Sequence, residues 1–285
     1  MLVGMKELLQ EAERGDYAVG CFNCTSLENV TAVIGAAEAC GKSVILGFPQ
    51  VHEKTVPLAV IGPILLAAAR AAKVPVCVHL DHGSTVEYLE RALELGFNSV
   101  MFDGSRLPLE ENIAQTKKVV ALARQYGACV EAELGGISGD EAGISTGESA
   151  AAALTDPDEA VRFVAETGID TLAASIGTAH GFYKLPPKLD FERIREIRGR
   201  TGVPLVMHGG SGVSDGDYRK AIHLGIRKIN YYSYMEKAGV DGVKELLARR
   251  DVKYFHELAI AATDGMKENV TRAICLFRPD SAENA

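Results

Sequence analysis

Three of the seven histidines are each followed by glycine and each come after a short apolar run: His82, His180 and His208. If these runs are parallel strands of one barrel, their carboxyl ends meet at one mouth and the three imidazoles converge. Three neutral imidazoles that leave one position open form the ligand set of a catalytic Zn²⁺. The spacing therefore predicts a metal centre, although each histidine taken alone is explained as well by a loop or core position.

Asp81 directly precedes His82, so both side chains leave the chain at the same rim. A carboxylate beside a polarised carbonyl can exchange a proton with the oxygen whose charge changes as a carbon–carbon bond breaks. An aspartate here could equally cap a helix or hydrogen-bond a histidine, and both interpretations stay open. His79, two residues before Asp81, is interpreted as a packed histidine without a catalytic role.

Short apolar runs alternate with stretches of helical periodicity along the whole chain. The expected strands are 18–22, 43–48, 74–80, 99–102, 128–133, 171–176, 203–207 and 226–231. The expected helices between them include 85–95, 110–126, 158–167, 190–198 and 215–224, and helices are predicted to stop at Gly41, Gly96, Gly127, Gly168 and Gly225. Polar and glycine-rich residues follow nearly every strand, which favours a closed (β/α)₈ TIM barrel over an open sheet. A helix near 5–14 and a helical stretch from 240 to 276 are expected as additions.

Length and composition limit the class of protein. The 285 residues contain no linker, which predicts a single domain over 1–285. A net charge of −8 without a long basic run argues against a nucleic acid partner. No segment resembles a signal peptide or a membrane span, so we expect a cytoplasmic protein without a membrane partner. The six scattered cysteines are expected to be mostly reduced thiols, with the Cys21-Phe22-Asn23-Cys24 spacing interpreted as structural.

The segment Val-His-Leu-Asp-His-Gly at 78–83 resembles the signature of class II fructose- and tagatose-bisphosphate aldolases. Further family-like segments follow in family order at 99–105, 130–135, 180–184, 187–191 and 208–212, so the resemblance covers most of the chain. It implies a zinc-dependent lyase of carbohydrate metabolism, such as glycolysis, on a TIM barrel. The implied reaction is reversible cleavage of a ketose 1-phosphate or ketose 1,6-bisphosphate to dihydroxyacetone phosphate and an aldehyde.

The resemblance also implies roles for single residues. Asp81 becomes the catalytic acid/base and His82, His180 and His208 the ligands of one Zn²⁺ ion. Asp103 and Glu133 are implied to hold an alternative metal position or to support these ligands. Glu141, in the glycine-rich loop 135–141, is the candidate for proton transfer at carbon.

Glycines after the seventh expected strand allow backbone N–H groups to approach an anion closely. Family context extends this to a phosphate cradle and to contacts with the rest of the phosphorylated sugar. The implied residues are Asn23, Gly181, Lys184, Gly209, Gly210, Ser211, Asn230 and Ser233, with Lys184 meeting a distal phosphate unless it is plain surface charge. Carbonyls near Gly181 and Gly209 are implied to hold a monovalent cation, Na⁺ or K⁺.

Two stretches depart from the family pattern. Gly47-Phe48-Pro49 stands where Gln-x-Ser is common, and Tyr231-Tyr232 bring rings beside Ser233 where small or acidic residues are usual. Ala142 likewise replaces an acidic loop residue. These changes predict an acceptor that is shorter or less polar beyond C3, so fructose 1,6-bisphosphate is not assumed as substrate.

Three further expectations concern the rival functions and the assembly. One rival is another metal-dependent TIM-barrel isomerase or hydrolase, which would usually need further carboxylates or a bridging lysine for a two-metal centre. The other is a catalytically silent barrel that binds sugar phosphates. The helical extension at the C-terminus suggests a homodimer or homotetramer.

Overall fold

The computed structural model describes residues 1–137, 139 and 154–279, and in them the chain forms a closed barrel of parallel strands. The strands follow one another round the barrel in chain order: β1 (Val19–Asn23), β2 (Val44–Pro49), β3 (Val76–Gly83), β4 (Ser99–Phe102), β5 (Cys129–Leu134), β6 (Thr171–Ala174), β7 (Leu205–Met207) and β8 (Ile226–Tyr231). The predicted TIM barrel is confirmed, and every expected strand overlaps an observed one.

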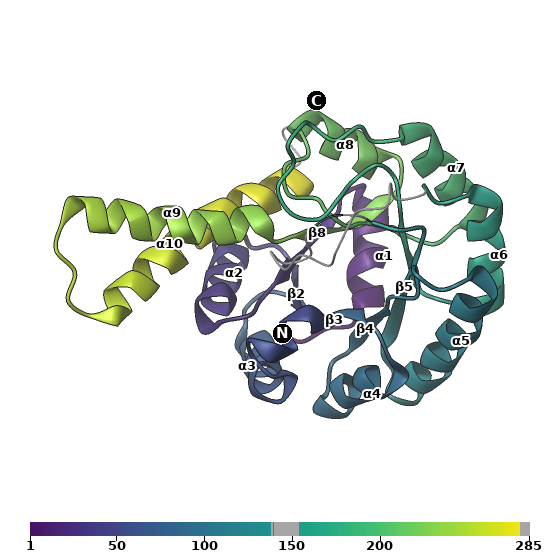
Figure 1. Ribbon diagram of the computed structural model, residues 1–285, viewed down its shortest axis with the longest axis horizontal. Helices are drawn as coiled ribbons and strands as arrows, with labels where there is room; N and C mark the ends of the chain where they lie inside the picture. The colour runs from purple at the N-terminus through teal and green to yellow at the C-terminus, as the bar shows by residue number, and fades with distance from the viewer. Residues whose placement is uncertain (138, 140–153, 280–285) are drawn as a thin grey trace.

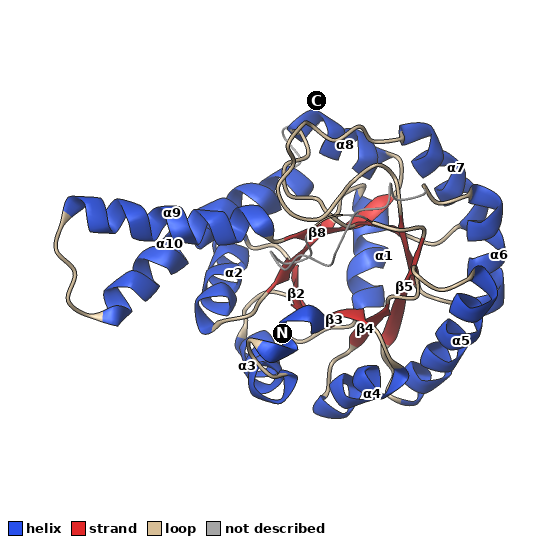
Figure 2. Ribbon diagram, viewed as in Figure 1, coloured by secondary structure: helices blue, strands red, loops and turns tan. Residues whose placement is uncertain are grey.

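Helices cover the outside of the barrel, as Figure 2 shows by the blue ring round the red strands. They are α2 (Leu27–Cys40), α3 (Leu58–Ala71), α4 (Val86–Leu95), α5 (Leu109–Gln125), α6 (Pro157–Thr167), α7 (Phe191–Thr201) and α8 (Asp215–His223), with a short 3₁₀ helix, η1 (Gln50–Lys54), after β2. The glycines predicted to stop helices all have positive φ, from 63° at Gly41 to 116° at Gly225. This is the left-handed conformation that ends a helix, so these predictions are confirmed.

The barrel interior is filled in layers. Helix α1 (Met5–Gly15) closes the amino-terminal end and packs into an apolar cluster made of Met5, Leu8, Leu9, Ala12, Tyr17, Val19, Cys21, Ile45, Cys77 and Cys129. A second small cluster inside the barrel contains Met101, Ala173 and Val206. Strand residues of the opposite phase, such as Val78 and Leu80, pack outward against the helices because side chains alternate along a strand.

The cysteines form no disulfide. Cys21 lies in the interior cluster closed by α1, whereas Cys24 lies in the layer between strands and helices. Burial raises the pKa of both thiols and so disfavours the thiolate that redox chemistry requires. These positions support the structural interpretation of the Cys21–Cys24 spacing.

The last two helices, α9 (Ser233–Arg249) and α10 (Phe255–Phe277), form a hairpin that projects from the barrel (Figure 1). The sequence predicted one helical stretch from residue 240, but the helices begin at Ser233 and are interrupted between 249 and 255. They cross closely at Gly242 and Gly265, where a Cβ on Gly242 would lie 2.5 Å from the carbonyl oxygen of Ala261. No helix in the described part of the chain is long and apolar enough to cross a membrane.

Candidate active site

The carboxyl end of β3 is bulged, and this brings two neighbouring side chains to one site. Successive side chains of a regular strand point to opposite faces. The pairing of β3 with β4 shifts register between Leu80 and Gly83, and His82 has a φ of 47°, a value uncommon outside glycine. A bulge of this kind turns a side chain to a new direction. Asp81 and His82 therefore both face the barrel mouth.

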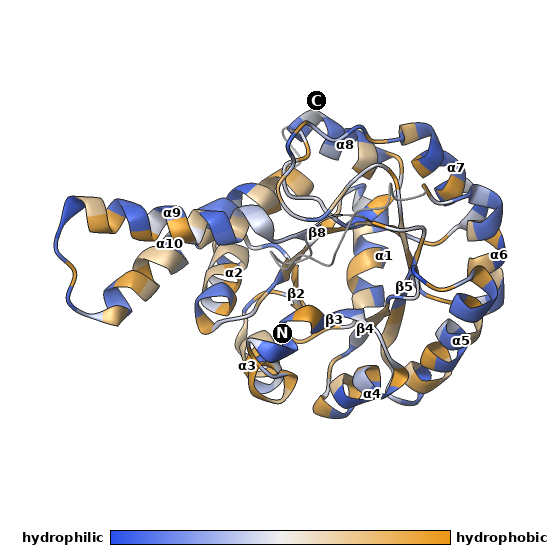
Figure 3. Cartoon of the chain, viewed as in Figure 1, coloured by the Kyte–Doolittle hydropathy of each residue, from blue (hydrophilic) through white to orange (hydrophobic). Residues whose placement is uncertain are grey.

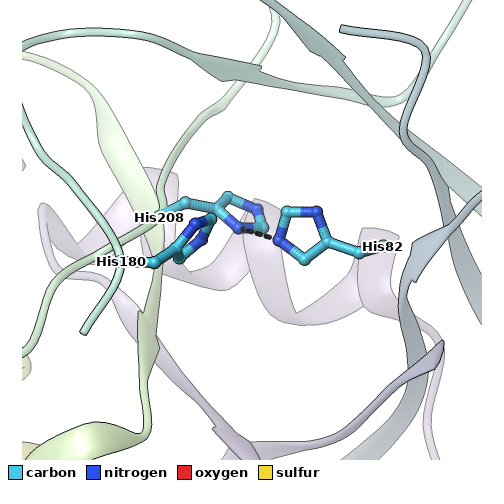
Figure 4. A group of neighbouring side chains, drawn as sticks. All are labelled: His82, His180 and His208. Carbon is cyan, nitrogen blue, oxygen red and sulfur yellow. Dashed lines mark hydrogen bonds between the residues drawn. The ribbon is translucent and has the colours of Figure 1, made fainter. Parts of the chain in front are cut away.

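The three predicted histidines converge there, as Figure 4 shows. His82 is the last residue but one of β3, His208 directly follows β7, and His180 lies in the loop after β6. One nitrogen from each ring lies within 4.8 Å of the others. His82 Nε2 and His208 Nδ1 are 2.9 Å apart, close to the separation of about 3.3 Å expected for two ligands of one tetrahedral Zn²⁺.

The opposite nitrogens of two of these rings are held by carboxylates. His208 Nε2 lies 2.8 Å from Glu131 Oε1, and His82 Nδ1 lies 3.0 Å from Asp103 Oδ2. Because a carboxylate accepts hydrogen bonds, the ring proton lies on the nitrogen that faces it. The other nitrogen of each ring keeps its lone pair, which points toward the centre of the cluster. Burial also lowers the pKa of His180 and His208, which favours the neutral form that binds metals. The donor set fits a divalent cation such as Zn²⁺.

Asp103 and Glu133 lie on the other side of the His82 ring. Glu133 Oε2 is 3.8 Å from His82 Nδ1, and Ser105 donates to the second oxygen of Asp103 from Oγ at 2.7 Å. Burial alone would raise the pKa of the Asp103 carboxyl, but hydrogen bonds from His82 and Ser105 outweigh it and lower that pKa. His82, Asp103 and Glu133 form a second group with metal-binding spacing, yet it uses the same imidazole as the first.

Asp81 is almost fully buried, and amide groups hold both of its carboxylate oxygens. Asn23 Nδ2 donates to Oδ2 at 2.8 Å and Asn230 Nδ2 donates to Oδ1 at 3.0 Å. Burial alone would raise the pKa of Asp81, but the imidazole of His82 and the buried ammonium ion of Lys228 outweigh it, so the pKa is lowered and the carboxylate is ionised at neutral pH. Gly47 provides space for this arrangement, since a Cβ there would lie 2.2 Å from Asn23 Oδ1.

Two charged residues beneath the mouth were missed by sequence reasoning. Lys228 and Glu131 are fully buried and form an ion pair with 2.8 Å between Nζ and Oε2. His79 lies beside them, 3.7 Å from Glu131 and 3.8 Å from Asp81, and its Nδ1 is 2.8 Å from Ser99 Oγ, which agrees with its interpretation as a packed histidine. The sequence did carry a signal for both residues. Each is a charged residue two positions before a predicted site residue, on the side of a buried strand that faces the barrel interior.

The mouth contains a pocket beside the histidines. Its lining residues are Asn23, Asp81, His82, His180, Gly181, Gly209, Gly210, Ser211, Asn230, Tyr232 and Ser233. This set includes every predicted substrate contact except Lys184, which is exposed elsewhere. Strand β8 ends at Tyr231 and α9 begins at Ser233, so Tyr232 has left the strand, and its hydroxyl lies 3.3 Å from His52 Nε2. Glu141 and Ala142 lie outside the described residues.

A larger groove of about 680 Å³ continues from the other side of the metal ligands. Its lining residues are Gln50, Val51, Glu53, Lys54, Thr55, His82, Ser84, Asp103, Arg106 and Leu107. Neither Lys54 nor Arg106 forms an ion pair with another described residue. The carboxylate of Glu53 accepts hydrogen bonds from Tyr88, Leu58 and Arg91. The charged side chains of the groove without an ion pair among the described residues are therefore the two cations.

Comparisons with known proteins agree with the geometry. The family model described as fructose-bisphosphate aldolase class-II matches residues 3–281. The chain is 43% identical over 257 residues to a 6-phospho-5-dehydro-2-deoxy-D-gluconate aldolase from Halalkalibacterium halodurans, covering 86% of this chain and 85% of that one. It is 44% identical over 254 residues to a fructose-bisphosphate aldolase from Geobacillus stearothermophilus, covering 87% and 86%. Among solved structures, the YdjI aldolase from Escherichia coli K12 superposes with a TM-score of 0.87 at 35% identity, covering 99% of each chain.

Proposed function

Because the chain belongs to the class II fructose-bisphosphate aldolase family, we propose that His82, His180 and His208 hold its catalytic Zn²⁺ and that Asp81 moves the proton in aldol cleavage. The enzyme is a carbon–carbon lyase, so the isomerase, hydrolase and silent-barrel alternatives lose their support. The observation that carries the residue assignment is the convergence of three imidazoles beside a carboxylate whose two oxygens are held by amides. When bound, Zn²⁺ would polarise the substrate carbonyl and stabilise the negative charge that develops on its oxygen.

Asp81 is proposed to remove the proton from the C4 hydroxyl as the C3–C4 bond breaks. Its lowered pKa supplies the carboxylate form, and the amides of Asn23 and Asn230 hold that carboxylate in one orientation. The Oδ1 atom of Asn23 is buried without a hydrogen-bond partner among the described residues, which suits it to accept from a substrate hydroxyl. Asp103 and Glu133 are proposed to support His82 rather than to bind a second ion, because Asp103 occupies the Nδ1 side of the same ring.

The substrate phosphate is proposed to bind in the pocket beside the histidines. Glycines at 181, 209 and 210 line it, together with Ser211 and with Ser233 at the first turn of α9. A helix amino terminus carries unpaired N–H groups and a partial positive charge, which suit an anion. We also propose a monovalent cation on carbonyls near Gly181 and Gly209. The carbonyl of Gly209 already accepts a hydrogen bond from Tyr183, which fixes its direction.

Glu141 keeps its proposed role of returning a proton to carbon. Lys184, which lines neither cavity, is proposed only as a further cation for a distal phosphate, beside the two that line the groove. The aldehyde half of the substrate is proposed to lie in the groove beyond His82 and Asp103. We expected a shorter or less polar acceptor from Pro49 and Tyr232. The groove favours a longer, polar acceptor with an anionic end, because Tyr232 lines the phosphate pocket instead and Lys54 and Arg106 line the groove.

The functional unit is proposed to be a homodimer or homotetramer in the cytoplasm. Figure 3 shows apolar segments along α9 and α10, the two helices that project from the barrel. Their exposed apolar residues include Val240, Leu247, Phe255 and Ile260. Such a surface is typical of a contact with another protein chain.

A substrate screen tests the proposed reaction. Metal-loaded enzyme would be given a panel of ketose 1-phosphates and ketose 1,6-bisphosphates, and release of dihydroxyacetone phosphate would be measured. We expect cleavage of at least one ketose 1-phosphate that carries an anionic far end. If no member of the panel released dihydroxyacetone phosphate, the proposed reaction would be wrong.

A further inference from the structure

Lys228 is a fully buried amine that the proposed reaction does not use. It lies in β8, two residues before Asn230, and its side chain has no exposed surface. Lysine is almost never fully buried unless its charge is paired, because an unpaired charge in a protein interior is very unfavourable. The contacts of its ammonium group should therefore reveal why a charge is kept at this position.

One contact leads to a proposed metal ligand. Lys228 Nζ lies 2.8 Å from Glu131 Oε2, and the other oxygen of Glu131 lies 2.8 Å from His208 Nε2. The ammonium ion keeps Glu131 charged, and the charged carboxylate holds the proton of His208 on Nε2. His208 Nδ1 then keeps its lone pair for the metal.

The second contact leads to Asp81. Lys228 Nζ donates to Asn230 Oδ1 at 2.8 Å, and Asn230 Nδ2 donates to Asp81 Oδ1 at 3.0 Å. An ammonium group has donors and no acceptor, so it selects the orientation of the Asn230 amide in which the oxygen faces Lys228. The amide N–H groups must then face Asp81. One buried charge thus contacts the residues that orient both His208 and Asp81.

We propose that Lys228 is a positioning residue which fixes the tautomer of His208 through Glu131 and the orientation of Asp81 through Asn230. The proposal rests on the function proposed above for His208 and Asp81. It differs from a merely structural role, because it predicts losses in metal affinity and in turnover that stability does not explain.

The test uses Lys228→Met, which keeps most of the length of the side chain and removes its charge and donors. Chelated protein would be titrated with Co²⁺ while the visible absorption of the bound ion is recorded, and kcat and KM would be measured separately. We expect Co²⁺ affinity to fall about 10-fold to 100-fold with an altered spectrum. We also expect kcat to fall at least 10-fold while KM changes less than about 3-fold.

Two further variants separate positioning from stability. Lys228→Met leaves the charge of Glu131 unpaired, so the double variant Lys228→Met/Glu131→Gln should recover thermal stability without recovering kcat. Glu131→Gln alone keeps Lys228 and its bond to Asn230, so it should weaken Co²⁺ binding more than it lowers kcat with saturating metal. It also serves as the test if Lys228→Met does not fold. Leu65→Ala, a buried variant of α3 in the layer outside the barrel, controls for general destabilisation.

The outcomes are distinguishable. If Lys228→Met and Glu131→Gln changed Co²⁺ affinity, spectrum and kcat no more than Leu65→Ala does, the positioning role would be wrong while the proposed function stood. If the wild-type protein did not bind about one Co²⁺ per chain, the proposed function would be wrong and the inference would fall with it.

Discussion

Asp81 lies within the barrel as an anion whose two oxygens are both occupied by amide donors. It is not a member of either group of side chains with metal-binding spacing. Proton transfer therefore suits it better than metal binding. His79 is likewise close to the site, 3.8 Å from Asp81, but it bonds to Ser99 through Nδ1 and belongs to neither group.

Replacement of Asp81 by alanine should separate chemistry from metal binding. We expect Asp81→Ala to retain wild-type metal content and to lose at least about 10²-fold in kcat, since general acid/base catalysis contributes about that much. Elemental analysis and dihydroxyacetone phosphate release on the same sample would measure both. Loss of metal together with activity would instead make Asp81 a structural support of the centre.

Protonation of His79 should make the protein less stable in acid. Burial lowers the pKa of His79 from 6.5 to about 3. Below pH 6.5 the unfolded chain takes up a proton that the folded protein excludes, so the stabilisation is complete above pH 6.5 and is lost as pH falls. When the pH falls from 7 to 5, the free energy of unfolding of the metal-free wild-type protein should decrease. In metal-free His79→Gln this decrease should be smaller by about 2 kcal/mol.

Denaturant unfolding at the two pH values measures this difference. The exposed His223, changed to glutamine, is the matched control and should follow wild type. An equal pH dependence in His79→Gln and wild type would mean that His79 is not neutral in the folded protein.

The sequence predicted the residues at strand ends better than those within strands. His82, His180 and His208 stand out because histidine beside glycine after an apolar run is an uncommon combination, and they do converge. Lys228 and Glu131 stand inside strands whose pattern predicts burial, and only their partners across the barrel show why charge is tolerated there. Those partners are 97 positions apart in the chain, so no local pattern could pair them.

At the scale of elements, the ends of the strands determine what the site can do. The bulge in β3 gives Asp81 and His82 a common direction, which the alternation of a regular strand would not allow. No sequence pattern signalled it, because the positive φ falls on a histidine and not on a glycine. Strand positions and glycine helix stops were predictable, since both depend on local periodicity and backbone preference.

The walls of the groove, formed by η1 and the loop after β4, should select the acceptor. Arg106→Ala and Lys54→Ala remove its uncommitted positive charges. Each should raise KM for a ketose with an anionic far end about 10-fold, because a charge-assisted hydrogen bond contributes about that much. A ketose with a neutral far end should change less than about 2-fold.

Lys118→Ala on the outer surface of α5 provides the control for loss of a positive charge. Steady-state kinetics with the paired substrates measures the effect. If both substrates responded equally, or if neither did, the acceptor would not lie in this groove.

At the scale of the whole molecule, the α9–α10 hairpin is anchored by the carboxyl-terminal half of α10, which is buried in the core, while its far end projects into solvent. Phe255 is 78% exposed and Leu247 is 53% exposed, an unfavourable situation for a hairpin that stays alone in water. We expect the wild-type protein to be a dimer or tetramer by light scattering. Leu247→Glu/Phe255→Glu should yield smaller species.

Leu185→Glu is the matched control, because Leu185 is 80% exposed but lies in the loop after β6 and not on the hairpin. It should leave the mass unchanged. A monomeric wild-type protein, or a hairpin variant with wild-type mass, would show that these helices do not mediate assembly.

Carbon–carbon cleavage is expected to depend on one metal ion held by three imidazoles. Release of dihydroxyacetone phosphate from a ketose 1-phosphate, before and after chelation and after stepwise return of Zn²⁺, tests it most directly. We predict that chelation abolishes release and that activity returns with about one Zn²⁺ per chain. Release that survived complete chelation, with a lysine adduct trapped by borohydride, would contradict the account.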